Sequence, residues 1–390
     1  MSSPNYPAPL VFIIAGEASG DLIGARLMTH LKYLLSESVR FDGIGGRRMA
    51  AEGLISRFPF TDLSLVGMTE VLPHVPKLLW RMHQTAKVIV NSRPEIVVFI
   101  DASGFSRGVA RRLKRKGIPL VQYKAPQAWA YWPWRARKMA KYFDHVFTIL
   151  PFEPEFFNAF GVHSTFIGHP AVESGAGKGD GIKFRARHGI PADSPVICIL
   201  PGSRKSEVHW SLDEFGSVLN KLAVAVPNLN VVVPTLDPVD KMVARAVAQW
   251  GVNTVVTNVH DERFDAFDAS DVALAVSGTV TAELACSGVP MVICNRVSKL
   301  TAAIVRRIIR VKYISVPNLL LNRAAVPEFI QENCRVHNIT PALVELLTDS
   351  AKRSAQIDDL KVVSALLGAG DLMPTERAAK ILMGYLQVPD

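Results

Sequence analysis

The stretch VICILPGSRKSEV, residues 196–208, determines the fold that this sequence predicts. Its first five residues are apolar and predict a short strand buried on both faces, which is typical of a parallel sheet. Pro201 and Gly202 then end the strand, and Ser203 is expected to cap a helix whose first turn contains Glu207. A strand, a glycine turn and a helix in this order form the repeating unit of doubly wound α/β domains.

The turn after this strand also carries groups that bind phosphate. Arg204 supplies a permanent positive charge beside the free backbone amides at the start of the helix. Backbone N–H groups, the helix dipole and a planar guanidinium all stabilise an anion. An ordinary turn with a solvated arginine would show the same residues. The motif alone therefore does not identify a phosphate site, and the rest of the chain must support that interpretation.

The composition limits the class of protein. The 390 residues, 49% of them hydrophobic, are enough for two domains. The 44 Lys and Arg against 35 Asp and Glu give a net charge of +9, which favours an anionic partner or surface without identifying it. The four cysteines form no CxxC pair, which is consistent with a reducing cytoplasm. No signal peptide and no apolar run of about 18 residues is present, so we expect a soluble or peripheral protein.

The first half of the chain alternates strands with helices. Residues 10–15 predict a buried strand, and GEASGD at 16–21 predicts a glycine turn whose serine or aspartate caps the next helix. This motif lacks the spacing of the dinucleotide fingerprint GxGxxG. Residues 96–100 predict a second buried strand, and Asp101 ends it. Because ligands of parallel sheets bind beyond the carboxyl ends of the strands, Asp101 is a candidate for chemistry as well as for a helix cap.

Residues 121–138 combine aromatic and basic side chains. Such a segment stacks nucleic-acid bases, lies at a lipid headgroup boundary, or fills the end of a sheet. No RNA-binding module surrounds it, so we expect no nucleic-acid partner. The glycine-rich segment 174–181 predicts an interdomain linker.

The second half repeats the pattern of the first. After the strand at 196–200, further strands are predicted at 231–234, 254–257 and 271–276. The turn SGTVT at 277–281 offers hydroxyls and amides for a second phosphate contact, and Glu283 binds a sugar hydroxyl or completes a capping box. No DxD motif follows a strand, so a metal-bridged diphosphate is not indicated. The residues therefore predict two doubly wound α/β domains that face each other across a cleft.

Eight motifs occur in order along nearly the whole chain. They are AGEASGD (15–21), IDA (100–102), APQAWAY (125–131), LPFEPEFF (150–157), IGHP (167–170), LPGSR (200–204), SGTVTAE (277–283) and PNLL (317–320). Together they resemble the lipid-A-disaccharide synthases, GT-B glycosyltransferases of Gram-negative bacteria. The resemblance implies a UDP-2,3-diacylglucosamine donor, a 2,3-diacylglucosamine 1-phosphate acceptor, and inversion at the donor to give a β-1,6-linked disaccharide 1-phosphate and UDP. It implies no cofactor and no metal.

The resemblance also implies roles for individual residues and domains. Asp101 matches the proposed general base. The residues matched to the UDP-sugar site are Gly202, Ser203, Arg204, Ser277, Gly278, Thr279, Thr281 and Glu283. The residues matched to the acceptor and sugar side are Gly16, Glu17, Ser19, Gly20 and Asn318. The expected domains are an acceptor-side, membrane-facing domain (1–173), a UDP-sugar domain (174–365) and a C-terminal helix (366–390) that packs back on the first domain.

Some positions depart from the family pattern, so the resemblance does not identify every residue that contacts the acceptor. Gly104 and Ser106 flank Phe105, where the family often has an acid and an amide. Trp132 replaces the usual basic residue, and Ala324 replaces the usual glutamate.

Both implied substrates are acylated, so we expect the protein to meet them at the cytoplasmic face of the inner membrane. Residues 70–90 predict an amphipathic helix with Lys77 and Arg81 near its apolar side chains. The expected membrane contacts are Leu72, Val75, Leu79, Trp80 and Met82. Alternatively, this helix only covers its sheet. The sequence does not decide whether the protein forms a homodimer.

Three other functions remain open from the sequence. Another GT-B enzyme, such as a peptidoglycan N-acetylglucosaminyltransferase or a UDP-sugar 2-epimerase, would keep the UDP half without the APQAWAY and LPFE motifs. An NAD-dependent oxidoreductase is disfavoured because its fingerprint is missing. A non-catalytic protein that binds a membrane surface would not need Asp101.

Overall fold

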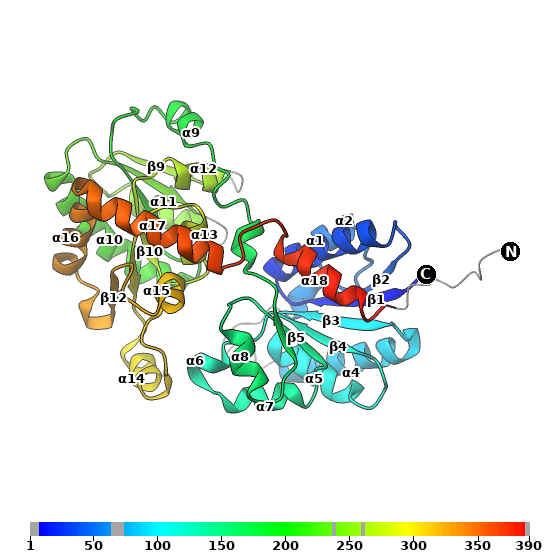
Figure 1. Ribbon diagram of the computed structural model, residues 1–390. Helices are drawn as coiled ribbons and strands as arrows, with labels where there is room; N and C mark the ends of the chain where they lie inside the picture. Colours follow the sequence, from blue (N-terminus) through cyan, green and yellow to red (C-terminus); the bar gives the residue numbers. More distant parts are fainter. Residues whose placement is uncertain (1–7, 64–73, 236–238, 259–261, 387–390) are drawn as a thin grey trace. The chain divides into compact units, whose positions relative to one another are not determined.

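The computed structural model describes residues 8–63, 74–235, 239–258 and 262–386. The chain forms two compact units: unit 1 comprises residues 1–170 and 370–390, and unit 2 comprises residues 171–369. The chain therefore leaves unit 1 once and returns to it at the C-terminal end (Figure 1).

Unit 1 is built on a parallel six-stranded sheet of order β2-β1-β3-β4-β5-β6. The strands are β1 (Leu10–Ala15), β2 (Arg40–Ile44), β3 (Ile96–Ile100), β4 (Leu120–Tyr123), β5 (His145–Thr148) and β6 (Ser164–Phe166). The helices are α1 (Ala18–Leu34), α2 (Arg47–Ala51), α4 (Val75–Ser92), α5 (Ser103–Leu113), α6 (Ala128–Tyr131), α7 (Trp134–Ala140), α8 (Glu153–Asn158) and α18 (Pro374–Met383).

Helices cover both faces of this sheet (Figure 1). Val11 and Ile13 of β1 pack in the core beneath α1 and α18, whereas Phe12 and Ile14 pack in the core beneath α4, α5 and α7. Because successive side chains of a strand point to opposite faces, a strand buried on both faces must be apolar throughout. The predicted strands at 10–15 and 96–100 are continuous apolar runs for this reason.

Unit 2 repeats this architecture with a parallel sheet of order β12-β11-β10-β7-β8-β9. The strands are β7 (Val196–Leu200), β8 (Asn230–Pro234), β9 (Thr254–Thr257), β10 (Val272–Val276), β11 (Met291–Asn295) and β12 (Glu328–Ile330). The helices are α9 (Gly181–Arg187), α10 (Lys205–Ala225), α11 (Asp240–Val247), α12 (Arg263–Asp268), α13 (Val280–Cys286), α14 (Lys299–Ile308), α15 (Val316–Leu321), α16 (Val336–Thr348) and α17 (Ser350–Leu366). Two doubly wound parallel sheets confirm the predicted α/β class.

The strand order reverses once in each sheet. In unit 1 the reversal falls between β1 and β3, and in unit 2 it falls between β7 and β10. Loops leave such a position in opposite directions, so a crevice forms beyond the carboxyl ends of the two strands. These two positions are where ligands are expected.

Two local expectations are wrong. The segment 174–181 is a packed part of unit 2: the Gly177 amide donates to Ser287 Oγ at 3.1 Å, and a Cβ on Gly179 would lie 2.1 Å from the Phe264 carbonyl oxygen. Asp21 does not cap α1. Its carboxylate accepts from the backbone amides of Gly46, Arg48 and Met49 at 2.7–3.1 Å and so caps α2.

None of the described helices is both long and apolar enough to cross a membrane.

Candidate active site

A pocket of about 290 Å³ lies at the strand reversal of unit 2, beyond the ends of β7, β8 and β10. Its polar lining residues are Gly202, Ser203, Arg204, Glu207, Thr235, Arg263, Ser277, Gly278, Thr279 and Glu283. The pocket therefore brings together the two turns that the sequence singled out, at 201–204 and 277–279. Thr281 does not line the pocket: it is fully buried, and its hydroxyl donates to the Gly278 carbonyl at 2.9 Å.

One end of this pocket consists of hydrogen-bond donors. The α10 helix begins at Lys205, one residue later than a Ser203 cap implies. The Glu207 carboxylate accepts from the amides of Ser203 and Arg204 at 3.1 and 3.2 Å, and from Arg204 Nη1 at 2.6 Å. Gly202 has φ +107°, and a Cβ there would lie 2.7 Å from Glu207 Cβ, so a glycine is needed at this turn. A diphosphate at this end would compete with Glu207 for the same donors.

The other end of the pocket holds a buried ion pair. Arg263 Nη2 lies 3.0 Å from Glu283 Oε1, with 19% and 11% of the two side chains exposed. Burial raises the pKa of the Glu283 carboxyl, and the charge and hydrogen bond of Arg263 oppose this shift. The Nε atom of Arg263 is buried with no hydrogen-bond partner in the described parts of the chain, so its hydrogen-bonding capacity is unsatisfied in this structure. The sequence pattern around Arg263 did not predict its ion pair with Glu283.

Asn318 supports the pocket from behind. It is 1% exposed and does not line the pocket. Its Nδ2 donates to Glu328 Oε1 at 2.8 Å, and Glu328 also accepts from the amides of Ile314 and Ser315. The Ile314 carbonyl in turn accepts from Ser277 Oγ at 3.3 Å. A chain of hydrogen bonds therefore connects Asn318 with the turn at 277–279.

In unit 1, Asp101 follows β3 at the strand reversal. Asp101 and Ala102 both adopt left-handed backbone conformations, with φ +57° and +47°. Two side chains hold the Asp101 carbonyl oxygen: Ser106 Oγ donates to it at 3.0 Å and Gln122 Nε2 at 3.4 Å. The departure at Ser106 is thereby explained, since its hydroxyl fixes the main chain of the candidate base. Strained backbone of this kind gathers at functional sites.

The motif at 16–21 lies beside Asp101. A Cβ on Gly16 would lie 2.3 Å from Ala102 Cβ, so only glycine permits this close approach. Gly20 also packs against Ile100, where an added Cβ would lie 3.4 Å from Ile100 Cγ2, an ordinary van der Waals contact. Glu17 and Ser19 are exposed at the start of α1. Their side chains are therefore accessible to a ligand.

Lys124 lies against the Asp101 carboxylate, and its charge acts on Glu153 and His169; none of these three residues was singled out in the sequence. Lys124 Nζ lies 3.0 Å from Asp101 Oδ1. Burial and the Lys124 charge lower the pKa of His169 to about 4. Burial raises the pKa of Glu153, while its hydrogen bonds and the Lys124 charge lower it. Glu153 and His169 belong to the motifs LPFE and IGHP, but spacing alone gave them no role.

The helix expected at the membrane is α4. Val75, Leu79 and Trp80 are exposed on it, by 36%, 48% and 56%. Met82 instead lies between α4 and α5, because a Cβ on Gly108 would lie only 2.3 Å from its sulfur. Leu72 lies outside the described residues. Lys77 and Arg81 both form ion pairs with the single carboxylate of Asp62, at 2.7 and 2.9 Å, which balances one of their two positive charges.

Solved structures share the fold at low sequence identity. UDP-GlcNAc 2-epimerase from Neisseria meningitidis bound to UDP-GlcNAc matches with a TM-score of 0.62 and 13% identity, over 96% of this chain and 98% of that one. MurG from Acinetobacter baumannii matches with a TM-score of 0.60 and 13% identity, over 96% and 99%. These likenesses confirm the GT-B class.

Sequence relatives are much closer. The lipid-A-disaccharide synthase of Rhodospirillum centenum is 47% identical over 97% of this chain and 94% of its own. That of Paramagnetospirillum magneticum is 42% identical over 97% and 98%. The family model described as lipid-A-disaccharide synthetase matches residues 11–382. The match extends over both sheets and both strand reversals, and the protein belongs to the lipid-A-disaccharide synthetase family.

Proposed function

We propose that this glycosyltransferase moves 2,3-diacylglucosamine from its UDP derivative to 2,3-diacylglucosamine 1-phosphate. The acceptor hydroxyl oxygen attacks the anomeric carbon of the donor as the bond to UDP breaks, and the carbon inverts. Asp101 takes the hydroxyl proton. The observation that carries the proposal is the pocket in unit 2, where amides, Arg204 and Arg263 meet at a strand reversal.

The proposed donor site divides between the two ends of this pocket. The amides of 203 and 204 and the Arg204 guanidinium hold the diphosphate and stabilise the charge that develops on UDP. The turn at 277–279 completes the phosphate contacts, and Glu283 accepts from a sugar hydroxyl. The epimerase from Neisseria meningitidis, which shares this fold, is bound to UDP-GlcNAc, and this supports a UDP-sugar as the ligand of the pocket.

The test of the proposal is a turnover assay with detergent-dispersed substrates. The expected products are UDP and a disaccharide 1-phosphate, both identified by mass spectrometry. Disaccharide formation must require both substrates. Epimerisation of UDP-GlcNAc, or binding without turnover, would instead support one of the alternative functions.

Arg204→Ala is expected to weaken UDP binding about tenfold or more, the lower range for a charge-assisted hydrogen bond, because 69% of this side chain is exposed. Isothermal titration calorimetry with UDP measures the effect. Since arginines supply the cations of this pocket, addition of EDTA should leave turnover unchanged. Loss of activity on chelation and its recovery with magnesium would contradict this assignment.

We further propose a peripheral contact between unit 1 and an anionic membrane. Residues 103–143 contain eleven Arg and Lys and no Asp or Glu. Within the described ranges only Lys124 of these forms an ion pair. Trp134 is 50% exposed, and Lys138 Nζ lies 4.6 Å from its ring. Because α4, α5 and α7 cover the same face of the sheet, the cations of α5 and α7 belong to the side of unit 1 that carries the exposed apolar side chains of α4.

The double variant Val75→Ser/Leu79→Ser is expected to lose most binding to anionic vesicles and most turnover of vesicle-borne substrate. Turnover in detergent should stay unchanged, because neither residue touches the candidate site. Vesicle flotation at low and high salt measures binding, which salt should weaken. Ile182→Ser/Val224→Ser removes exposed apolar side chains from unit 2 and serves as the control. Unchanged flotation of the α4 variant would place the membrane contact elsewhere.

A further inference from the structure

Of the two carboxylate oxygens of Asp101, one is ion-paired and the other is buried in this structure. Oδ1 is held by Lys124 Nζ at 3.0 Å. Oδ2 is buried and has no hydrogen-bond partner within the described parts of the chain. A general base must reach the proton that it removes. Some group around Asp101 must therefore move before the proposed reaction can take place.

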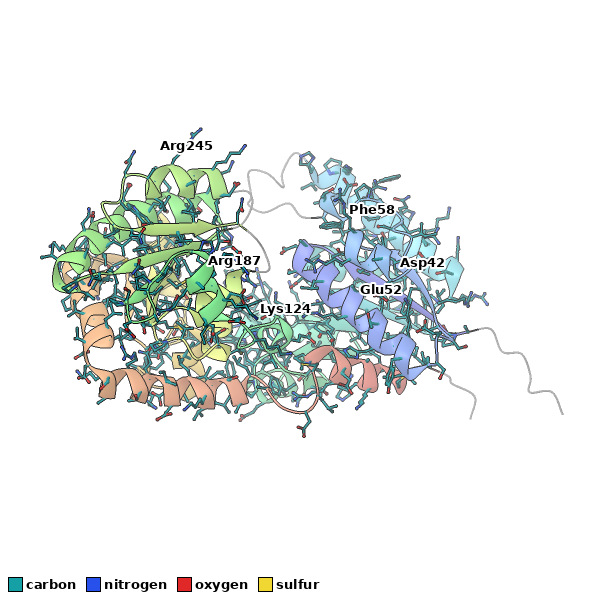
Figure 2. All side chains as sticks on the ribbon, turned by 90° about the horizontal axis from the view of Figure 1, so that it is seen from above. Asp42, Glu52, Phe58, Lys124, Arg187 and Arg245 are labelled. Atoms are coloured by element: carbon teal, nitrogen blue, oxygen red, sulfur yellow. The ribbon has the colours of Figure 1, made fainter. Side chains whose placement is uncertain are left out.

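The main chain at this position is held firmly. Ile100 and Tyr123 are register partners in β3 and β4, so Asp101 and Lys124 leave the two strands side by side. Lys124 also has a left-handed backbone, with φ +66°. Hydrogen bonds from Ser106 and Gln122 fix the Asp101 carbonyl. The mobile partner is consequently the Lys124 side chain, which is 37% exposed and ends a flexible four-carbon stem (Figure 2).

The charge of Lys124 acts on a second carboxylate of this unit, that of Glu153. Both oxygens of Glu153 are already bonded. Oε1 accepts from Trp129 Nε1 at 2.9 Å, and Oε2 accepts from the Ile149 and Leu150 amides at 2.9 Å. His169 is buried, and its lowered pKa keeps it neutral near pH 7. An ammonium group that leaves Asp101 therefore needs an anion from outside.

We propose that Lys124 blocks the base in the free enzyme and moves to the phosphate group of the acceptor when the acceptor binds, which frees Oδ1 of Asp101. The inference rests on the proposed function, in which the reacting hydroxyl and the phosphate belong to one sugar ring. A hydroxyl placed at Asp101 brings that phosphate close to Lys124. Lys124 is then the residue that makes turnover depend on an acceptor phosphate.

The test compares acceptors with and without the 1-phosphate, both dispersed in detergent. The wild-type protein should prefer the phosphorylated acceptor about 10–100-fold in kcat/KM, the range for one charge-assisted contact. In Lys124→Met this preference should fall to less than about threefold, and Lys124→Arg should restore most of it. Circular dichroism and a cooperative thermal unfolding transition show that each variant is folded, and Lys124→Gln replaces the Met variant if that one does not fold.

Lys183→Met provides the matched control. It breaks another lysine–aspartate pair, with Asp180 at 2.7 Å in unit 2, and should keep the wild-type preference. As a second measurement, inorganic phosphite added with the unphosphorylated acceptor should stimulate the wild-type protein but not Lys124→Met. Wild-type preference in a folded Lys124→Met would overturn the inference while the proposed function stands. Absence of any disaccharide from the wild-type protein would overturn the proposed function instead.

Discussion

Asp101→Asn is expected to lower kcat by about 100-fold or more while UDP binding is retained. The amide has nearly the shape of the carboxylate but cannot take a proton from the acceptor hydroxyl. UDP binding should survive because Asp101 belongs to unit 1, whereas every residue of the proposed donor pocket belongs to unit 2. Steady-state kinetics and UDP calorimetry on the same preparation measure both effects.

Asp101→Asn also leaves Lys124 without its ion pair, and this second effect needs a control. Lys124 faces Asp101 at 3.0 Å, so an asparagine there removes the charge that balances it. The double variant Asp101→Asn/Lys124→Met removes both charges and should remain as slow as the single variant. Turnover within threefold of wild type in a folded Asp101→Asn would exclude Asp101 as the base.

Glu283→Ala should lower the free energy of unfolding of unit 2 by about 3–5 kcal/mol, the usual effect of removing one partner of a buried ion pair. The loss arises because Arg263 is left buried without its carboxylate. UDP-sugar binding should also weaken, since Glu283 is the proposed acceptor for a sugar hydroxyl. Urea unfolding followed by tryptophan fluorescence measures the first effect, and calorimetry with UDP-GlcNAc measures the second.

A double variant separates these two effects. Arg263→Met/Glu283→Leu replaces the ion pair with apolar side chains of similar volume, which restores stability in many proteins. Stability should therefore recover, whereas binding of the nucleotide sugar should not. Recovery of both would mean that the pair has only a structural role.

The strands could be predicted from the sequence because the sheets are covered on both faces. β1, β3, β7 and β9 begin and end at the predicted residues. In β1, β3 and β7, burial on both faces removes the alternation that a half-exposed strand shows and leaves a continuous run with sharp ends, whereas β9 is an edge strand that is only partly buried. Two series of such strands, each alternating with helices, predict the GT-B class. The eight ordered motifs indicate the family.

Contacts between distant residues could not be predicted in this way. Asp21 looked like a cap of its own helix but binds amides 25 to 28 residues away. Lys124 meets Asp101 only because β3 and β4 are neighbours in a particular register, which no local pattern encodes. Arg263 likewise reaches Glu283 across twenty residues. The glycine turns of the candidate sites could be identified in the sequence, whereas the charged side chains that pair with Asp101 and Glu283 could not.

The return of the chain to unit 1 has a consequence for protein synthesis. Ala378, Ala379, Leu382 and Leu386 complete the core on the α1 face of its sheet, and they are translated after the whole of unit 2. Unit 2 is one continuous stretch and can form as soon as residue 369 has left the ribosome. Unit 1 begins first, but one apolar face of its sheet stays uncovered until residues 370–386 have also left the ribosome. A stalled ribosome near residue 370 would thus expose a ready binding surface for chaperones on the older half of the molecule.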